Sequence, residues 1–128
     1  MSQLLTTEDL NHPGWVPPVS WFVSRVCWRE VGRRLSQNPD VIEQSKKHLD
    51  SQLVSGDYSC SPVYLRRWKE LLDGGLSPVL EVLNSPDDNQ SQVLRSCTPM
   101  PIRRLLPPEE RDVILSKVKE EMEERGVV

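Results

Sequence analysis

The sequence of 128 residues contains no alanine and only one phenylalanine. Alanine has the highest intrinsic helix propensity, so any helices here depend on packing and end caps more than on local preference. Apolar runs of about 18 residues, the length that a membrane-spanning helix needs, are also absent. We therefore expect no membrane-spanning segment.

The amino terminus and the charge balance each lack a targeting or binding signal. MSQLLTTEDL has neither the basic start nor the apolar centre of a secretory signal, so we expect a cytoplasmic protein. The 16 lysines and arginines are outnumbered by 19 aspartates and glutamates, giving a formal net charge of -3. This balance argues against a dominant basic surface that neutralises phosphates. Nucleic acid is therefore not the favoured partner.

Residues that hold metals or perform catalysis are scarce. His12 and His48 are the only histidines, and neither has a cysteine or histidine at zinc-ligand spacing. The sequence has no Gly-rich phosphate loop and no HExxH, GxSxG or CxxC motif. Glu109 and Glu110 are adjacent, so on a helix they diverge by about 100° and are better placed to complement the helix dipole. We expect no metal, no cofactor, no small-molecule substrate, no catalytic residue and no enzymatic activity.

The cysteines do not form a disulfide pattern. Cys27, Cys60 and Cys97 are odd in number and far apart along the chain. Such spacing suits reduced thiols better than a disulfide framework. We therefore expect three inert free thiols.

Proline is abundant, and four of the 11 prolines directly follow an asparagine or a serine. The Asn or Ser oxygen can accept a hydrogen bond from the first turn of a helix, while proline fixes φ at the first helical position. Each pair therefore predicts a helix start. The pairs are Asn38-Pro39, Ser61-Pro62, Ser77-Pro78 and Ser85-Pro86.

Apolar residues recur at three- and four-residue spacings after these pairs and in two further segments. The two further helices are predicted to begin at Ser20 and near Pro107-Pro108, and the helix from Pro62 to end at Gly74-Gly75. No apolar/polar alternation or Asn-Gly turn predicts a strand. We expect an all-α fold, a compact single-domain bundle of about six helices, several of them short.

The same spacings predict which residues fill the core. The helix from Ser20 should bury Val23, Cys27, Trp28, Val31 and Leu35, and the helix from Pro62 should bury Trp68. The last helix carries only a narrow apolar seam of Ile114, Val118 and Met122. We expect only its first half to be well anchored.

We expect a helical core at residues 20–97. Three segments depart from its pattern of capped helices. They are an N-terminal arm rich in proline and tryptophan at 1–19, a Pro-rich loop at 98–108 and an acidic C-terminal helix at 109–128. The chain is short enough that we expect these segments to belong to a single domain. Because they break the pattern, they are the first candidates for a function.

The Pro-rich loop, TPMPIRRLLPP, combines apolar side chains with arginines. Its prolines predict an extended, stiff segment that loses little entropy when a partner orders it, and its composition matches interface centres. We predict that Met100, Ile102, Arg103 and Arg104 bind a partner. The alternative is a buried crossover that only links two helices.

Trp15 and the C-terminal glutamates are further candidates for partner binding. Trp15, in HPGWVPP, either packs the arm onto the bundle or anchors an interface. Glu120, Glu121 and Glu124 lie in the last turns of the last helix, where acidic charge opposes the helix dipole. They form either an acidic surface for a basic partner or a fraying, solubilising tail.

Several motifs follow one another between residues 28 and 114. They are WREVGRRLSQNPDVIEQ, YLRRWKELLDGG, SPVLEVLNSPDDNQSQVLRS and TPMPIRRLLPPEERDVI. In this order the sequence resembles a group of small bacterial antitoxin-like proteins of toxin–antitoxin pairs, all-helical and without an evident helix-turn-helix. Two features depart from that group, since Met100 stands where a phenylalanine is usual and alanine is absent.

The resemblance implies a protein that binds and silences a toxin encoded beside it. We therefore expect a non-catalytic protein-binding module whose partner is a cognate toxin or another protein. Two alternatives stay open. One is a scaffold or adaptor that joins two other proteins. The other is a DNA-binding regulator in which Arg25, Arg29, Arg33 and Arg34 face phosphates.

Overall fold

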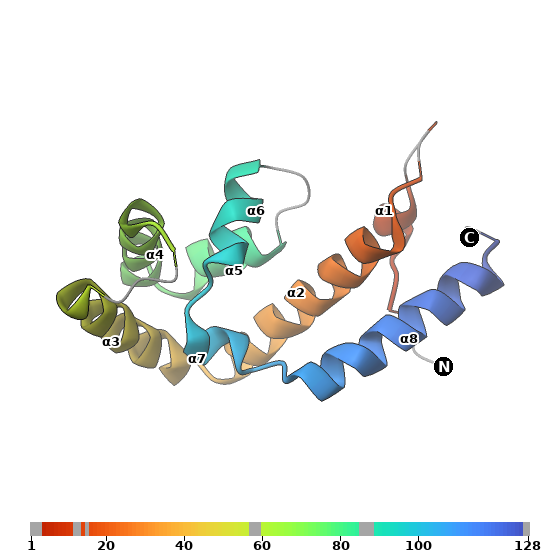
Figure 1. Cartoon of the computed structure of the whole chain (residues 1–128). Helices are drawn as coiled ribbons and strands as arrows, with labels where there is room; N and C mark the ends of the chain where they lie inside the picture. Colours follow the sequence, from red (N-terminus) through yellow and green to blue (C-terminus); the bar gives the residue numbers. More distant parts are fainter. Residues whose placement is uncertain (1–3, 12–13, 15, 57–59, 85–88, 127–128) are drawn as a thin grey trace. The chain divides into compact units, whose positions relative to one another are not determined.

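The computed structural model describes residues 4–11, 14, 16–56, 60–84 and 89–126 (Figure 1). Every regular element in these ranges is an α-helix, which confirms the all-α prediction. None of these helices is both long enough and apolar enough to cross a bilayer. The described ranges contain eight helices instead of about six, because the single-turn helices α1 and α7 were not predicted. The helices are α1 (Thr7–Leu10), α2 (Val19–Gln37), α3 (Asp40–Ser55), α4 (Pro62–Asp73), α5 (Leu76–Asn84), α6 (Asn89–Ser96), α7 (Met100–Arg103) and α8 (Pro108–Glu124).

Contacts within the chain divide it into two units. The first comprises residues 1–30 and 106–128, and the second comprises residues 31–105. The first unit contains α1, α8 and the start of α2, while the second contains the end of α2 and all helices from α3 to α7. The predicted single domain stays a prediction.

Helix α4 begins and ends where the sequence predicts. It starts at Pro62 with Ser61 as its N-cap. The Ser61 side chain makes no capping hydrogen bond, and its backbone carbonyl instead accepts from Tyr64 N at 3.0 Å. The chain leaves the helix at Gly75, which has a φ of 89° that a residue with a Cβ rarely adopts. Local signals thus set both ends of this helix.

The other proline pairs mark helix starts less uniformly. Helix α5 begins at Leu76, so Pro78 lies inside its first turn. The N-cap of α3 is Pro39, and the side-chain amide of Asn38 donates to Arg34 O, 2.9 Å away at the end of α2. Ser85-Pro86 lies outside the described residues. Proline therefore predicts helices here better than it predicts their first residue.

The core of the first unit lies between the start of α2, α8 and the segment before α1. This arrangement corrects two predictions. The buried stripe of α2 includes Phe22 and Val26, whereas Val23 and Trp28 are only half-buried. The second half of α8 is anchored, because segments distant in sequence cover its narrow apolar seam. The buried residues of this cluster are Leu5, Phe22, Val26, Val118 and Met122.

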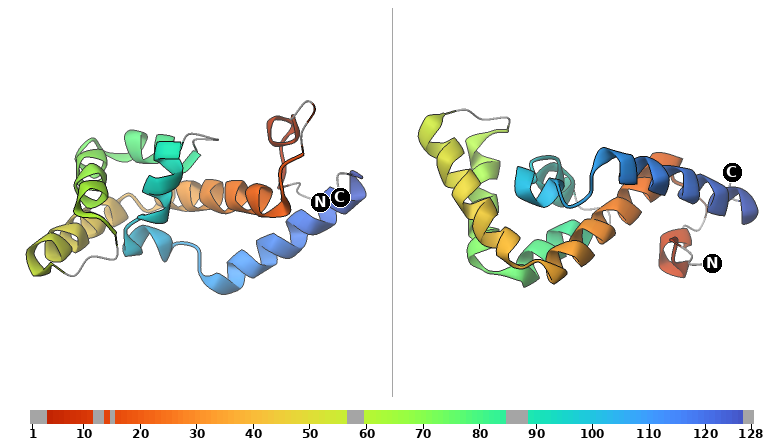
Figure 2. Two further views of the ribbon diagram at one scale, coloured as in Figure 1. Left: turned by 45° about the horizontal axis from the view of Figure 1, so that its top comes forward. Right: turned by 90° about the horizontal axis from the view of Figure 1, so that it is seen from below.

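The core of the second unit contains Trp68 of α4, fully buried as predicted. Helix α3 packs against α4 and α7, α4 packs against α5, and α5 packs against α6. Two further views show α3 and α4 side by side (Figure 2). The indole Nε1 of Trp68 donates to Leu94 O at 2.7 Å and so connects α4 to α6.

A disulfide joins Cys60, just before α4, to Cys97, just after α6, with Cα atoms 6.0 Å apart. The prediction of three free thiols is wrong for this pair, because the path through α4, α5 and α6 brings two distant cysteines together. Cys27 is free and buried. Burial raises the pKa of the Cys27 thiol, although the charge of Arg111 opposes this, so little of the reactive thiolate is present at neutral pH.

The Pro-rich segment at 98–108 is not extended, contrary to prediction. Its residues Met100–Arg103 form α7, with Pro99 as the N-cap. Pro101 does not prevent this, because proline is tolerated in the first turn of a helix. Arg34 Nη1 also donates to Leu105 O at 2.7 Å. The segment therefore behaves more like the alternative, a packed crossover between helices.

Candidate functional site

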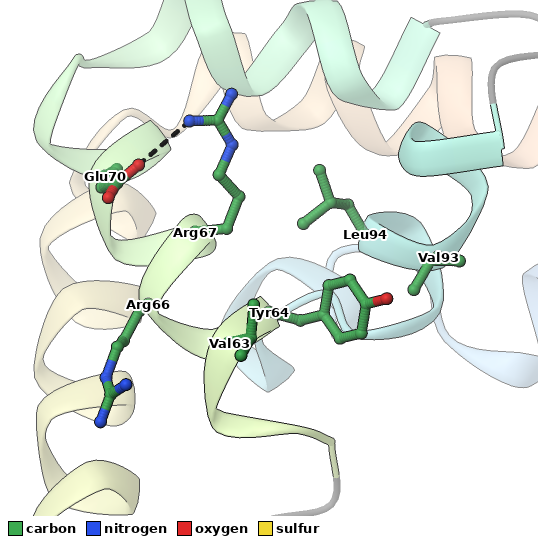
Figure 3. A pocket seen from close by; sticks show the side chains of 7 residues that line it. All are labelled: Val63, Tyr64, Arg66, Arg67, Glu70, Val93 and Leu94. Carbon is green, nitrogen blue, oxygen red and sulfur yellow. Dashed lines mark hydrogen bonds and ion pairs between the residues drawn. The ribbon is translucent and has the colours of Figure 1, made fainter.

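A groove between α4 and α6 brings exposed apolar side chains together. Its cavity of 620 Å³ has seven lining residues, shown in Figure 3. The exposed fraction is 66% for Val63, 37% for Tyr64 and 38% for Val93. Apolar side chains beside arginines are typical of interface centres. This α4–α6 groove is lined by Val63, Tyr64, Arg66, Arg67, Glu70, Val93 and Leu94.

The amphipathic pattern of the two helices explains why these side chains are exposed. The apolar stripe of α4 buries Leu65, Trp68, Leu71 and Leu72. Val63 and Tyr64 fall outside this stripe and therefore face the groove. On α6, Val93 and Leu94 are adjacent and diverge by about 100°, so both cannot point into the core. Leu94 is buried and Val93 is left at the surface.

The polar side chains of the groove are unequally paired. Tyr64 extends towards Val93, and Arg67 Nη1 lies 3.0 Å from Glu70 Oε2 (Figure 3). Arg66 extends away from Val93, and in the part of the chain that the structure describes its guanidinium has no ion-pair partner. Among the described residues, this positive charge at the edge of the groove has no ion-pair partner.

Two direct links between described residues connect the walls of the groove. One is the hydrogen bond from Trp68 Nε1 to Leu94 O, in the middle of α4. The other is the Cys60–Cys97 disulfide, at the start of α4 and the end of α6. Both links come from residues that also belong to the core or border it, so packing in the core positions the exposed side chains.

The four residues predicted in the Pro-rich segment have different environments. Met100 and Arg104 are exposed and accessible to a partner. Arg103 is half-buried, and its guanidinium donates to Thr98 O at 2.9 Å and also to Ser96 O. Ile102 is fully buried, so as a partner-binding residue it is corrected to a core residue.

The C-terminal glutamates also separate into two kinds. Glu120 and Glu124 are exposed on α8. The carboxylate of Glu121 instead accepts hydrogen bonds from Leu4 N at 2.9 and 3.0 Å. Glu121 therefore holds the N-terminal segment, and α8 is helical as far as Glu124. Trp15, the remaining candidate, lies outside the described residues.

The arginines considered for DNA binding contact groups within the chain. Arg29 Nη1 and Arg25 Nη2 lie 2.8 and 3.5 Å from the carboxylate of Asp9. Arg34 donates to Leu105 O. These contacts use part of the hydrogen-bonding capacity that phosphate groups would need.

Asp9 is a buried carboxylate with a structural role. It forms a capping box with Thr6 at the start of α1 and has an exposed fraction of 0%. Burial by itself raises the pKa of Asp9. The hydrogen bond from Thr6 N and the hydrogen bond and charge of Arg29 more than offset this, so the pKa lies below its ordinary value. The carboxylate is thus held ionised as an ion-pair partner.

Metal-binding side chains do not converge within the described ranges, where no group of three or more His, Cys, Asp or Glu residues could hold an ion. The residues that sequence reasoning missed are Val63, Tyr64 and Val93. Their signal was an apolar side chain outside the buried stripe of its helix. Single exposed apolar residues are common on protein surfaces, however, so only the fold reveals that these three share a groove.

Comparisons with known proteins found nothing similar. No protein-family model, curated protein or solved structure matches this chain. The case for a function therefore depends on the chain's own residues.

Proposed function

We propose that this chain is a non-catalytic protein-binding module that neutralises a partner toxin by direct contact through the α4–α6 groove. The observation that carries the proposal is the meeting of Val63, Tyr64 and Val93, from two helices, in one groove beside two arginines. Tyrosine and arginine are enriched among residues that dominate binding energy. The motif order that resembles antitoxin-like proteins supports the choice of a toxin as partner.

The groove suits an amphipathic helix of the partner that carries at least one carboxylate. The apolar face of such a helix would cover Val63, Tyr64 and Val93, as in other helix-in-groove complexes. Its carboxylate would meet Arg66, which has no ion-pair partner among the described residues. A single short segment of the partner could therefore make both contacts.

The chemistry of the groove supports binding better than catalysis. Glu70 is its acidic residue, and that carboxylate is paired with Arg67. The lining includes neither histidine nor cysteine, and so offers no nucleophile beside a base. We accordingly propose stoichiometric binding without turnover and without a cofactor.

The two alternatives differ in how well the structure supports them. A DNA-binding regulator is the weaker one, because Arg25, Arg29 and Arg34 contact groups within the chain. An adaptor would use the same α4–α6 groove and would differ only in its partner.

The proposed location is the cytoplasm. Disulfides persist in oxidising compartments, whereas in the cytoplasm they are mostly transient redox pairs. In the cytoplasm the Cys60–Cys97 disulfide would therefore be a transient redox pair. A cytoplasmic protein with this pair would therefore alternate between oxidised and reduced forms.

Co-expression with the product of the neighbouring gene tests the proposal. We expect the two proteins to elute as one complex in size-exclusion chromatography and the growth arrest caused by the partner to be relieved. Val63→Asp should abolish both effects, because it places a carboxylate among the apolar side chains of the groove. Val54→Asp is the matched control, since Val54 lies on α3 outside the groove and is 89% exposed.

Separate elution with unrelieved growth arrest would sink the proposal. Equal effects of Val63→Asp and Val54→Asp would leave the partner but reject the groove as its binding site. Fluorescence anisotropy on promoter DNA at two salt concentrations tests the regulator alternative, since binding through phosphate contacts weakens steeply with salt.

A further inference from the structure

The disulfide lies at one end of the α4–α6 groove. Cys60 precedes Val63 by about one helical turn, and Cys97 follows Leu94 by about one turn. Val63 and Leu94 both line the groove, one on each wall. The covalent bond therefore fixes the distance between the two walls directly beside the residues that a partner would contact.

The contacts that hold α6 to α4 are partly indirect. Helix α4 packs against α5, and α5 packs against α6, so α6 is held to α4 partly through a third helix. Two direct links between described residues of the walls are the disulfide and the hydrogen bond from Trp68 Nε1 to Leu94 O. Reduction removes the covalent link, and a neutral hydrogen bond such as that from Trp68 Nε1 to Leu94 O is weak enough for the groove to open locally.

The disulfide also borders a second cavity. This cavity of 220 Å³ has Cys60, Cys97, His48, Met100 and Arg103 in its lining. Cys60 is half-buried, whereas Cys97 is buried. Of the two cysteines, Cys60 is therefore the more exposed to a small dithiol and Cys97 the better protected.

We propose that the Cys60–Cys97 disulfide is a redox switch that keeps the α4–α6 groove in its binding shape and releases it when a dithiol reduces the bond. The inference rests on the proposed binding function, whose site it regulates. The oxidised chain binds the partner, and the reduced chain has separated walls and binds weakly. Redox state thus determines when the partner is free.

The reduction proceeds by thiol–disulfide exchange. A thiolate of the dithiol attacks Cys60 Sγ, the bond to Cys97 Sγ breaks, and Cys97 leaves as a thiolate that takes up a proton. The second thiol of the reductant then attacks the mixed disulfide and releases Cys60. The reductant becomes a cyclic disulfide, and the protein gains two electrons and two protons.

Hydrogen–deuterium exchange on the full chain tests the switch without a partner. The oxidised protein is compared with protein treated with dithiothreitol and with the double variant Cys60→Ser/Cys97→Ser. We expect amides in α4 near Val63 and in α6 near Val93 to exchange on the order of tenfold faster in the reduced protein and in the double variant. Amides of α8, which belongs to the other unit, should not change.

The double variant is also the control for the reductant, because dithiothreitol should have no effect on it. Unchanged exchange of α4 and α6 after reduction would overturn the proposal. Equal acceleration in α8, with loss of far-ultraviolet circular dichroism, would overturn it too, because the bond would then stabilise the whole fold instead of the groove.

A binding measurement separates this inference from the proposed function. Oxidised and reduced protein are titrated with the neighbouring gene product, and affinity should fall on the order of tenfold on reduction. No binding in either redox state, with the exchange difference intact, would reject the proposed function but keep the switch. Equal binding in both states would reject the switch but keep the function.

Discussion

Arg29 lies 2.8 Å from the carboxylate of Asp9, the fully buried acidic residue in the capping box of α1. The same guanidinium donates from Nη2 to Leu4 O at 2.9 Å. One arginine of α2 thus holds two points of the N-terminal segment. Since both partners lie within the first 11 residues, the arm is attached by ionic and polar contacts as well as by its apolar residues.

Replacing Asp9 should destabilise the fold. Asp9→Asn keeps the shape and one capping oxygen but removes the charge opposite Arg29. We expect the free energy of unfolding to fall by about 2–3 kcal/mol, less than for a fully buried pair because the Arg29 side chain is 30% exposed. Urea unfolding measures the change. Glu70→Gln, which breaks an exposed ion pair, is the control and should cost less than about 1 kcal/mol. Equal costs would contradict the structural role of Asp9.

The lowered pKa of Asp9 predicts a pH dependence of stability. Between the folded-state pKa and the ordinary value of 3.8, the unfolded chain binds more protons than the folded one, so stability rises with pH. The contribution of the ionised Asp9 to the free energy of unfolding is complete above the ordinary pKa and is lost as pH falls through the folded-state pKa. The stability difference between wild type and Asp9→Asn should therefore shrink below about pH 4. A difference that stays constant under acid would contradict this.

Helix α4 shows how much of the fold local sequence signals can predict. Its start at Pro62, its end before Gly75 and its buried Trp68 were all predictable, because proline, glycine and apolar spacing act within a few residues. Helix α8 shows the opposite. The seam of Val118 and Met122 looked too narrow to be anchored, and only the distant Leu5 and Phe22 complete the cluster that buries it.

The candidate site was less predictable than the fold for the same physical reason. Composition identified apolar residues and arginines in the segment 98–108, but it could not separate the exposed Met100 from the buried Ile102. The α4–α6 groove depends on a meeting of two helices and on a disulfide across 37 residues of sequence. Such pairing is non-local, so a single sequence gives no direct signal for it.

Ser45 of α3 is a buried hydroxyl whose replacement should stabilise the protein. Its side chain has an exposed fraction of 0%, and its Oγ has no hydrogen-bond partner among the described residues. Ser45→Ala removes this unsatisfied group and raises helix propensity, so we expect a gain of about 1–2 kcal/mol in the free energy of unfolding. Thermal and urea unfolding both measure it.

The exposed Ser51 of the same helix provides the control for Ser45. Ser51→Ala should gain only the propensity difference, about 0.5 kcal/mol. If Ser45→Ala stabilised the protein no more than Ser51→Ala, the prediction would be wrong, because the buried hydroxyl would then have a hydrogen-bond partner.

The C-terminal glutamates allow a last comparison within one helix turn. Glu121→Ala leaves the partly buried N–H of Leu4 without its acceptor, and hydrogen bonds to a charged group contribute about 1.5–3 kcal/mol. We expect a loss in that range, with faster hydrogen exchange in the segment 4–11. Glu120→Ala and Glu124→Ala remove exposed carboxylates and should change stability by less than about 0.5 kcal/mol. If all three substitutions cost equally little, Glu121 would belong with the surface acids, and α8 would be free to serve as an acidic binding surface along its whole last turn.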